Sequence, residues 1–459
     1  MKLGKLSLIA AVALGCVAGA NAADTLTEAL TNGKLSTTLR AVYADKTNQE
    51  NAYQNEHIFG MGVEVGYVTD PLYGFRIGVT GQGWTSPYSP SRGAKSYYDK
   101  EFYANGFVMS ELYLGYGIGK TDIKVGRQYV VTPLVAGNYT RGFKEAFEGV
   151  SIVNKDIPGT TLGAGWYYKF QGRSKVAMGG GTAGKTGRAP TFKDRVIMGG
   201  LTGPVTMEFD DIYTLYIENK SVPGLKLTGA FARVSDVVYP RNSKKENDVN
   251  LYLLEANYKL PVADLLKVGV DAMWKGSRVN NELDKANYDG DMFGFRAGVY
   301  DFYGAGLSYA FTRVSDDDAV ILGVGNGPGS YTALPIRGPF VYTAYAGMDT
   351  HKFTLDYNFS AIGVKGLKAS AQYVRGNQST PSRTAGATRA NTHMDVRGYA
   401  GVLSYDVEAV KGLSVSATYT DLERLKYNAA GTRTSDQNER ELWLQASYKF
   451  DLLGTAEKK

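Results

Sequence analysis

Cysteine is almost absent from this chain, and histidine is scarce. Cys16 is the single cysteine among 459 residues, and the histidines are His57, His351 and His393. With one cysteine the chain forms no internal disulfide. The three histidines stand at no metal-ligand spacing, so the sequence predicts neither a metal site nor a cofactor.

After its first residues the chain lacks any apolar run of eighteen or more, so no spanning helix is predicted. Residues 1–22 are predicted to be a secretory signal peptide, in which an apolar run follows two lysines and Ala20-Asn21-Ala22 forms an A-x-A cleavage site. Cys16 lies in this run, where ALGC loosely resembles a lipobox, but the A-x-A site fits better. The mature chain then begins near Ala23 without cysteine and is exported through the general secretory route.

A strong charge of either sign is also missing. The formal charge is +6, and removing Lys2 and Lys5 with the leader leaves +4. An excess so small and dispersed gives no basis for nucleic-acid binding. Glycine (56 residues) and tyrosine (33 residues) are abundant instead. An exported, aromatic-rich chain without a spanning helix is either a soluble β protein or a β-barrel of the outer membrane.

Alternation of apolar and polar residues favours the barrel. In KFTLDYNF, Leu355 and Tyr357 share one face, while Lys352 and Asp356 share the other. Alternating segments occupy residues 34–45, 57–69, 73–84, 108–119, 121–130, 143–154, 160–172, 211–219, 224–234, 248–259, 266–276, 291–300, 303–314, 351–359, 366–375, 395–406, 412–423 and 440–450. Eighteen is an even number, as a closed bacterial barrel requires. The predicted fold is all-β, an 18-stranded antiparallel transmembrane β-barrel.

The gaps between these segments alternate in length. The short gaps include 70–73, 155–159, 220–224, 260–265, 361–366 and 407–412. The long gaps are 46–56, 85–107, 131–142, 174–210, 235–247, 277–290, 315–350, 376–394 and 424–439. This rhythm predicts short periplasmic turns and long extracellular loops. No domain boundary is visible, so residues 23–459 are predicted to form one barrel domain.

The two faces of the segments differ in chemistry. One carries leucine, valine, phenylalanine and tyrosine, which suit lipid. The other carries many charged side chains, whose burial in a dry core would be very costly. They include Lys34, Arg40, Glu64, Arg76, Glu111, Lys169, Lys226, Glu255, Asp271, Arg296, Lys352, Asp356 and Lys368. A barrel of eighteen strands is too wide for side chains to fill, so a water-filled lumen is predicted.

Four stretches are distinctive: NGKLSTTLR near the mature start, VGRQYVVTPLVAGNYTRGFKEAFEGVSI at 125–152, the VPGLKL turn and the last strand. They resemble the OprD family of outer-membrane porins. The resemblance implies an eighteen-stranded channel narrowed by its third and seventh outer loops, with a ladder of basic side chains that guides small, often carboxylate-bearing solutes. By position, Arg40 and Arg127 belong to that ladder.

Arg76 and Arg296 join the expected pore-lining set from their faces alone. Arg127 has the parity of Ile123 and Val125, which should face lipid. Either Gly126 marks a bulge that turns Arg127 inward or the inward assignment is wrong.

The third loop corresponds to 131–142 and the seventh to 315–350. In the third loop, the candidate constriction residues are Pro133, Tyr139 and Arg141. In the seventh they are Asp316, Asp317 and Asp318, as an acidic lip facing the basic residues, and Tyr331. The alternative for each of them is an ordinary loop residue exposed to solvent. The glycines of GVGNGPG at 323–329 would let the seventh loop bend into the lumen.

A phosphate-loop pattern, GGGTAGKT at 179–186, competes with this interpretation. It lies within a long loop, and Gly187 and Pro190 occupy the position where the required helix should begin. A flexible glycine-rich loop is therefore expected. An enzyme barrel would need a base near a nucleophile or paired acids, and no such constellation is visible, so no catalytic residue is assigned.

The sequence thus predicts a channel of a Gram-negative outer membrane for passive diffusion of small hydrophilic solutes. Its partners are outer-membrane lipid and those solutes, and both a monomer and a homotrimer are compatible with the sequence. The alternative is a structural or adhesive surface barrel with a plugged lumen. Solute identity and charge preference stay open, because inward charges of both signs occur.

Overall fold

The computed structural model describes residues 23–48, 56–88, 98, 101–179, 189–201, 206–240, 243–263, 266–336, 341–378, 393–428 and 430–451. The predicted signal peptide, residues 1–22, lies outside the described residues. No helix within these ranges is long and apolar enough to cross a membrane.

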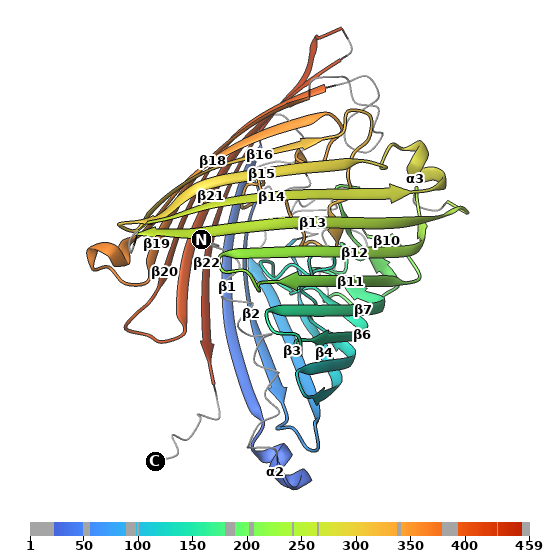
Figure 1. Cartoon of the computed structure of the whole chain (residues 1–459), viewed down its shortest axis with the longest axis vertical. Coiled ribbons are helices and arrows are strands. Elements are labelled where there is room, and N and C mark those ends of the chain that lie inside the picture. The colour runs from blue at the N-terminus through green and yellow to red at the C-terminus, as the bar shows by residue number, and fades with distance from the viewer. Residues whose placement is uncertain are drawn as a thin grey trace.

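Eighteen antiparallel strands form one closed sheet (Figure 1). The first nine are β1 (Lys34–Asn48), β2 (Glu56–Val68), β3 (Phe75–Tyr88), β4 (Gly106–Ile118), β5 (Thr121–Gln128), β6 (Ala146–Asn154), β7 (Thr160–Gln171), β11 (Ile212–Asn219) and β12 (Leu225–Val238). The other nine are β13 (Glu246–Ala263), β14 (Leu266–Val279), β15 (Asp291–Phe302), β16 (Ala305–Val314), β18 (Met348–Asn358), β19 (Leu367–Gln378), β20 (His393–Asp406), β21 (Leu413–Tyr427) and β22 (Arg433–Phe450). Each strand pairs with the next, and β22 pairs with β1 from Phe450↔Thr37 to Glu439↔Asn48, which closes the ring.

The remaining elements are short. Four two-residue strands lie in outer loops: β8 (Arg195–Val196), β9 (Met198–Gly199), β10 (Met207–Glu208) and β17 (Gly323–Val324). The helices are α2 (Leu26–Thr31), α3 (Asn281–Lys285) and the 3-10 turn η4 (Phe359–Ile362). Helix α2 precedes β1 on the short-turn side, where Thr25 caps it by accepting a hydrogen bond from the Glu28 N–H at 3.2 Å.

All eighteen predicted segments are confirmed as barrel strands, with short periplasmic turns and long extracellular loops. The bounds differ mainly on the loop side. Strand β22 begins at Arg433 rather than at residue 440, because its pairing with β21 continues beyond the membrane. Conversely, β6 begins at Ala146 rather than at 143, since residues 143–145 belong to the third loop and contact other loops.

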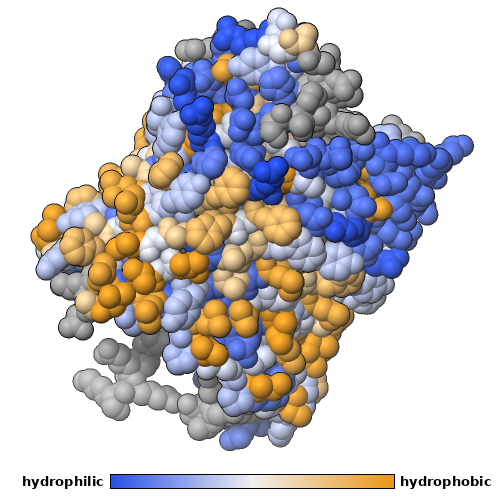
Figure 2. Space-filling model, turned by 45° about the horizontal axis from the view of Figure 1, so that its top comes forward, coloured by the Kyte–Doolittle hydropathy of each residue, from blue (hydrophilic) through white to orange (hydrophobic). Residues whose placement is uncertain are grey.

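Apolar side chains face outward from the barrel. Leu254 in the middle of β13 is 60% exposed and Leu355 on β18 is 54% exposed, although both are hydrophobic. Figure 2 shows hydrophobic side chains gathered over the lower part of the visible wall and hydrophilic ones above it. Thr354 and Asp356, which flank Leu355 in the sequence, point into the barrel instead. This arrangement is that of a wall surrounded by lipid.

An apolar cluster nevertheless lies inside the barrel. It joins inward side chains of the wall with residues of the third, fourth and seventh outer loops. We call these segments loop three (129–145), loop four (172–211) and loop seven (315–347). Leu134, Met198 and Val324 represent the three loops in this cluster, and each is at most 1% exposed. The three loops therefore fill part of the lumen.

The outward orientation of Leu254 predicts the cost of a charge there. Leu254→Arg should lower the free energy of unfolding by about 2–4 kcal/mol, as expected for an outward arginine near the bilayer midplane. Urea unfolding in phospholipid bilayers measures it. Asn257→Arg is the control, because the Asn257 side chain points inward at Asp271 and Glu255. It should change the free energy of unfolding by less than about 1 kcal/mol. Equal costs would place Leu254 away from lipid.

Candidate functional site

Loop three folds back on itself inside the barrel. A bridge joins Val131 to Ala136, and the Thr132 hydroxyl caps the turn by accepting a hydrogen bond from the Val135 N–H at 3.0 Å. Pro133 lies in this turn, within loop three but half-buried. Further along, the Tyr139 hydroxyl donates to the Val130 carbonyl at 3.2 Å, which returns the loop to its start.

Loop seven pairs directly with loop three. The Ala136 N–H donates to the Val324 carbonyl at 3.0 Å, and the Val324 N–H donates to the Leu134 carbonyl at 2.8 Å. Glycine is required at this contact: Gly325 has φ +78°, and a Cβ there would lie 2.2 Å from the Ala136 carbonyl oxygen. The glycine-rich segment 323–329 thus bends loop seven against loop three, as its composition predicted.

Loop four also enters the lumen, which the sequence did not predict. Strand β9 pairs with β17 through Met198↔Val324, and the Gly325 N–H donates to the Ile197 carbonyl at 2.7 Å. One signal in the sequence could have shown this. The run Val196-Ile197-Met198 is apolar although it lies in a long outer loop, and all three residues are at most 1% exposed.

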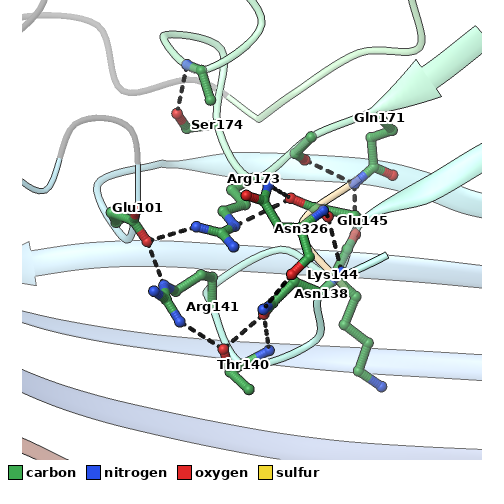
Figure 3. A network of polar contacts seen from close by, with 12 residues as sticks. Glu101, Asn138, Thr140, Arg141, Lys144, Glu145, Gln171, Arg173, Ser174 and Asn326 are labelled. Atoms are coloured by element: carbon green, nitrogen blue, oxygen red, sulfur yellow. Dashed lines mark hydrogen bonds and ion pairs between the residues drawn. The ribbon is translucent and has the colours of Figure 1, made fainter. Parts of the chain in front are cut away.

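A buried polar network ties the loops together (Figure 3). The Glu145 carboxylate is fully buried and accepts hydrogen bonds from the Asn138 N–H at 2.8 Å and the Asn326 N–H at 3.1 Å. Arg173 of loop four donates from Nε to Glu145 at 3.1 Å and from Nη1 to Glu101 at 2.9 Å. A buried carboxylate that accepts several hydrogen bonds fixes three chain segments at one point.

Arg40 of β1 points into the lumen and holds loop three. Its guanidinium donates to the carbonyl oxygens of Tyr139 at 3.3 Å, Arg141 at 2.8 Å and Gly142. Arg40, which the sequence predicts to line the pore, therefore fixes loop three to the wall through its hydrogen bonds to backbone carbonyl oxygens.

Lys144 attaches the end of loop three to the wall. Its ammonium lies 2.6 Å from Glu64 of β2, which also accepts a hydrogen bond from the Tyr129 hydroxyl at 3.0 Å. Burial lowers the pKa of Lys144, and the nearby Glu64 carboxylate opposes that shift. Burial raises the pKa of the Tyr129 hydroxyl, so this phenol stays neutral.

Loop seven is held from the opposite wall. The ammonium of Lys275 donates to the Gly329 carbonyl at 2.8 Å, and that of Lys352 donates to the Ala333 carbonyl at 2.7 Å. The Tyr331 ring lies 4.6 Å from the Arg296 guanidinium, and its hydroxyl donates to Glu255 at 2.6 Å.

Arg296 and Arg76 both point inward and are both ion-paired. Arg296 donates from Nε to Asp271 at 2.6 Å, and its side chain is 34% exposed. Arg76 lies near the short-turn end of β3, pairs with Asp122 of β5 and is buried. Tyr331 and Arg296 are thus in contact where loop seven meets the wall, whereas Arg76 lies apart from them, near the short turns.

Arg127 lies on the outward side of the barrel, contrary to the pore-lining expectation. Pairing runs through Gly126 without a register shift, and Arg127 lies opposite Leu112, a residue that faces lipid. Its Nε is 3.0 Å from Glu148, which shares the outward parity. Gly126 therefore makes no bulge, and the sequence parity of Val125 placed Arg127 correctly.

Two further candidates lie away from the lumen centre. Arg141 is 9% exposed, pairs with Glu101, and its guanidinium lies 4.2 Å from the Trp443 ring, so it anchors loop three to the wall. Asp316 is 3.6 Å from Arg313, an outward residue at the end of β16.

Asp317 is exposed, and Asp318 lies beside Asp289, with burial raising the pKa of the Asp318 carboxyl. The three aspartates thus lie at the outer rim, because loop seven enters the lumen only after residue 318. They do not face the inward arginines.

Among the described residues, no group of three or more histidine, cysteine, aspartate or glutamate side chains is placed to hold a metal ion. Most of the phosphate-loop pattern, residues 180–186, lies outside the described residues. The described residues 189–194 that follow contain no helix.

Residues 1–450 match the family model described as Campylobacter major outer membrane protein. The chain belongs to this family. It is an outer-membrane porin for small solutes, in contact with outer-membrane lipid, and its family and fold point to a transport channel. No curated protein matches the chain.

Solved porin structures share its fold. Acinetobacter baumannii OccAB2 superposes with a TM-score of 0.71 at 16% identity, covering 92% of this chain and 99% of that one. Pseudomonas aeruginosa OccK8 (OprE) gives 0.68 at 17% identity over 92% and 98% of the two chains. Pseudomonas aeruginosa OpdQ superposes with a TM-score of 0.67 at 16% identity, covering 93% of this chain and 100% of that one. The resemblance to OprD-family porins is thereby confirmed at the level of the fold.

Glu145 and Glu148 offer a matched pair for testing the loop network. Glu145→Gln replaces a carboxylate oxygen with an amide NH₂, which faces other hydrogen-bond donors. The free energy that holds loops three, four and seven together should therefore fall by about 3 kcal/mol. Single-channel recordings should then show larger and less steady current steps. Glu148→Gln, on the outer face, should leave the steps unchanged; identical recordings from both variants would contradict the role of Glu145.

Proposed function

We propose that this porin favours small hydrophilic solutes bearing a carboxylate, which pass between the basic side chains of the inner wall and the inserted loops. The observation that carries the proposal is the placement of cations at the loop contacts. Arg40 meets loop three, whereas Arg296 and Lys352 meet loop seven, so positive groups from two walls border the narrowed region.

The partners of these cations support attraction of anions. Arg40 and Lys352 are held by backbone carbonyl oxygens rather than by carboxylates in direct contact. A backbone carbonyl accepts the hydrogen bond of such a side chain but carries no formal negative charge, so the positive charge of the side chain is not cancelled. A carboxylate solute would therefore gain long-range attraction on entering, while a neutral solute of the same size would not.

Acidic groups moderate this preference. Asp271 pairs with Arg296, and Glu64 lies against Lys144, so the wall carries both signs. Opposed charges across a narrow passage orient a solute that carries a charge and a dipole. The proposal therefore concerns a modest preference for carboxylates rather than exclusion of cations.

A plugged surface barrel is the second candidate. The apolar cluster of the three loops inside the ring is the observation that favours it. A measurement of ion conduction distinguishes the porin from the plugged barrel.

Two further proposals rest on the sequence. One is that the assembly contains one copy or three, and the other is that the chain is cleaved near Ala23 on export.

Arg296 and Arg313 lie on adjacent strands, one inside and one outside. Arg296→Gln leaves Asp271 alone in the passage, and a unit charge at 4 Å in water contributes about 1 kcal/mol. Uptake of a small carboxylate into proteoliposomes should fall about fivefold, with uptake of a neutral sugar unchanged. Arg313→Gln is the control and should alter neither; equal losses for both solutes would show a size effect instead of steering.

A further inference from the structure

A second charged feature lies on the outside of the barrel, at its extracellular end. In the described part of the chain, seven outward arginines lie near this rim: Arg127, Arg233, Arg278, Arg313, Arg375, Arg397 and Arg440. Six of them have a carboxylate oxygen within 2.8–3.6 Å. Arg375 differs from the other six, because within the described ranges no ion-pair or hydrogen-bond partner is found for it.

The neighbours of Arg375 make its position more unusual. On β18, β19 and β20, which lie side by side in Figure 1, His351, Arg375 and Arg397 are directly opposite one another. Both arginines are exposed, and the Arg397 side chain is 57% accessible. Like charges directly opposite in an antiparallel pair repel each other and destabilise the sheet. An anion bridging the two guanidinium groups would remove this repulsion.

The nearby acidic groups are already engaged or lie further out. Glu423 binds Arg397 at 2.8 Å, and Asp349 lies 3.6 Å from Arg313. Asp349, Asn377 and Asp395 form the next row toward the extracellular side. The row that contains Arg375 is therefore basic at its own depth.

Aromatic rings fix that depth. The next row toward the periplasm consists of Phe353, Tyr373 and Tyr399, and the last two rings are 5.2 Å apart. Tyr309 continues this row, with its ring 5.1 Å from Phe353. Aromatic belts lie at the level of lipid headgroups, so the arginines one row above them lie at the polar part of the outer leaflet.

Below the rings the wall is shallow and apolar. Leu355, Ala371 and Gly401 lie opposite one another on the three strands, and a Cβ at Gly401 would meet nothing within 4 Å. Leu355 is exposed beside Ala371, and Leu403 is exposed one row below Gly401 on β20. Small residues next to exposed leucines leave room for an acyl chain against the strands.

We propose that the outward faces of β18, β19 and β20 bind a phosphorylated lipid of the outer leaflet, whose phosphate bridges Arg375 and Arg397 and whose acyl chain lies along Ala371 and Gly401. Guanidinium groups bind phosphate bidentately, and two such groups at headgroup depth match a phosphate monoester. Charge complementarity favours this occupant over a second copy of the same face, which would bring arginine against arginine.

Lipid A with two phosphates, in mixed micelles with dodecyl maltoside, is the probe, and native mass spectrometry measures the lipid bound. The wild-type protein should bind lipid A at least tenfold more tightly than the same lipid treated with phosphatase. Arg375→Gln should weaken lipid A binding about tenfold, and Arg440→Gln, whose arginine is paired with Asp421, should bind as the wild type does. Unchanged single-channel current verifies that each variant is folded.

Four results would overturn the proposal. Equally tight binding of the dephosphorylated lipid would show that the phosphate does not contribute to binding. Equal weakening of lipid A binding in both variants would show that the effect is not specific to Arg375. Inorganic phosphate that displaces lipid A at a comparable concentration would point to a free anion. Light scattering measures the molar mass of the lipid-free proteins. A lower molar mass for Arg375→Gln than for the wild type would show that this face is a contact between copies instead.

Discussion

The rest of the structure depends on closure of the sheet by β1 and β22. Because the last strand pairs with the first, every strand has two neighbours and no backbone edge faces lipid. Closure also separates two environments that one strand must serve with alternate side chains. Leu355 meets lipid while Asp356 faces the interior, and a shift of one residue would exchange them.

Closure creates an interior that strands alone cannot fill, and loops three, four and seven occupy part of it. They do so as a small folded unit with its own apolar contacts and a buried carboxylate, Glu145, at its centre. The wall then holds this unit with cations: Arg40 on one side, Lys275 and Lys352 on the other. These cations position the loops, and in the proposed function Arg40 and Lys352 also attract a passing solute.

Much of this could be predicted from the sequence, and the physical reason is locality. Alternation with period two is contained within each strand, so all eighteen strands could be predicted. The parity of Val125 places Arg127 outward, and the pore-lining assignment of Arg127, which followed the family resemblance instead, was wrong. Loop docking depends on distant partners. The apolar run Val196-Ile197-Met198 indicates burial, but its partner β17 lies far away in the sequence. Asp316, Asp317 and Asp318 stay at the rim because loop seven turns inward only after them, and no local pattern marks that point.

The most direct test is the single-channel conductance of the unaltered protein in a planar bilayer, measured with polyethylene glycols of increasing size. A barrel narrowed by three loops should give discrete current steps, and polymers much narrower than an empty eighteen-stranded barrel should already be excluded. Absence of steps from folded protein, or free entry of polymers as wide as the empty barrel, would contradict the structure of the channel described above.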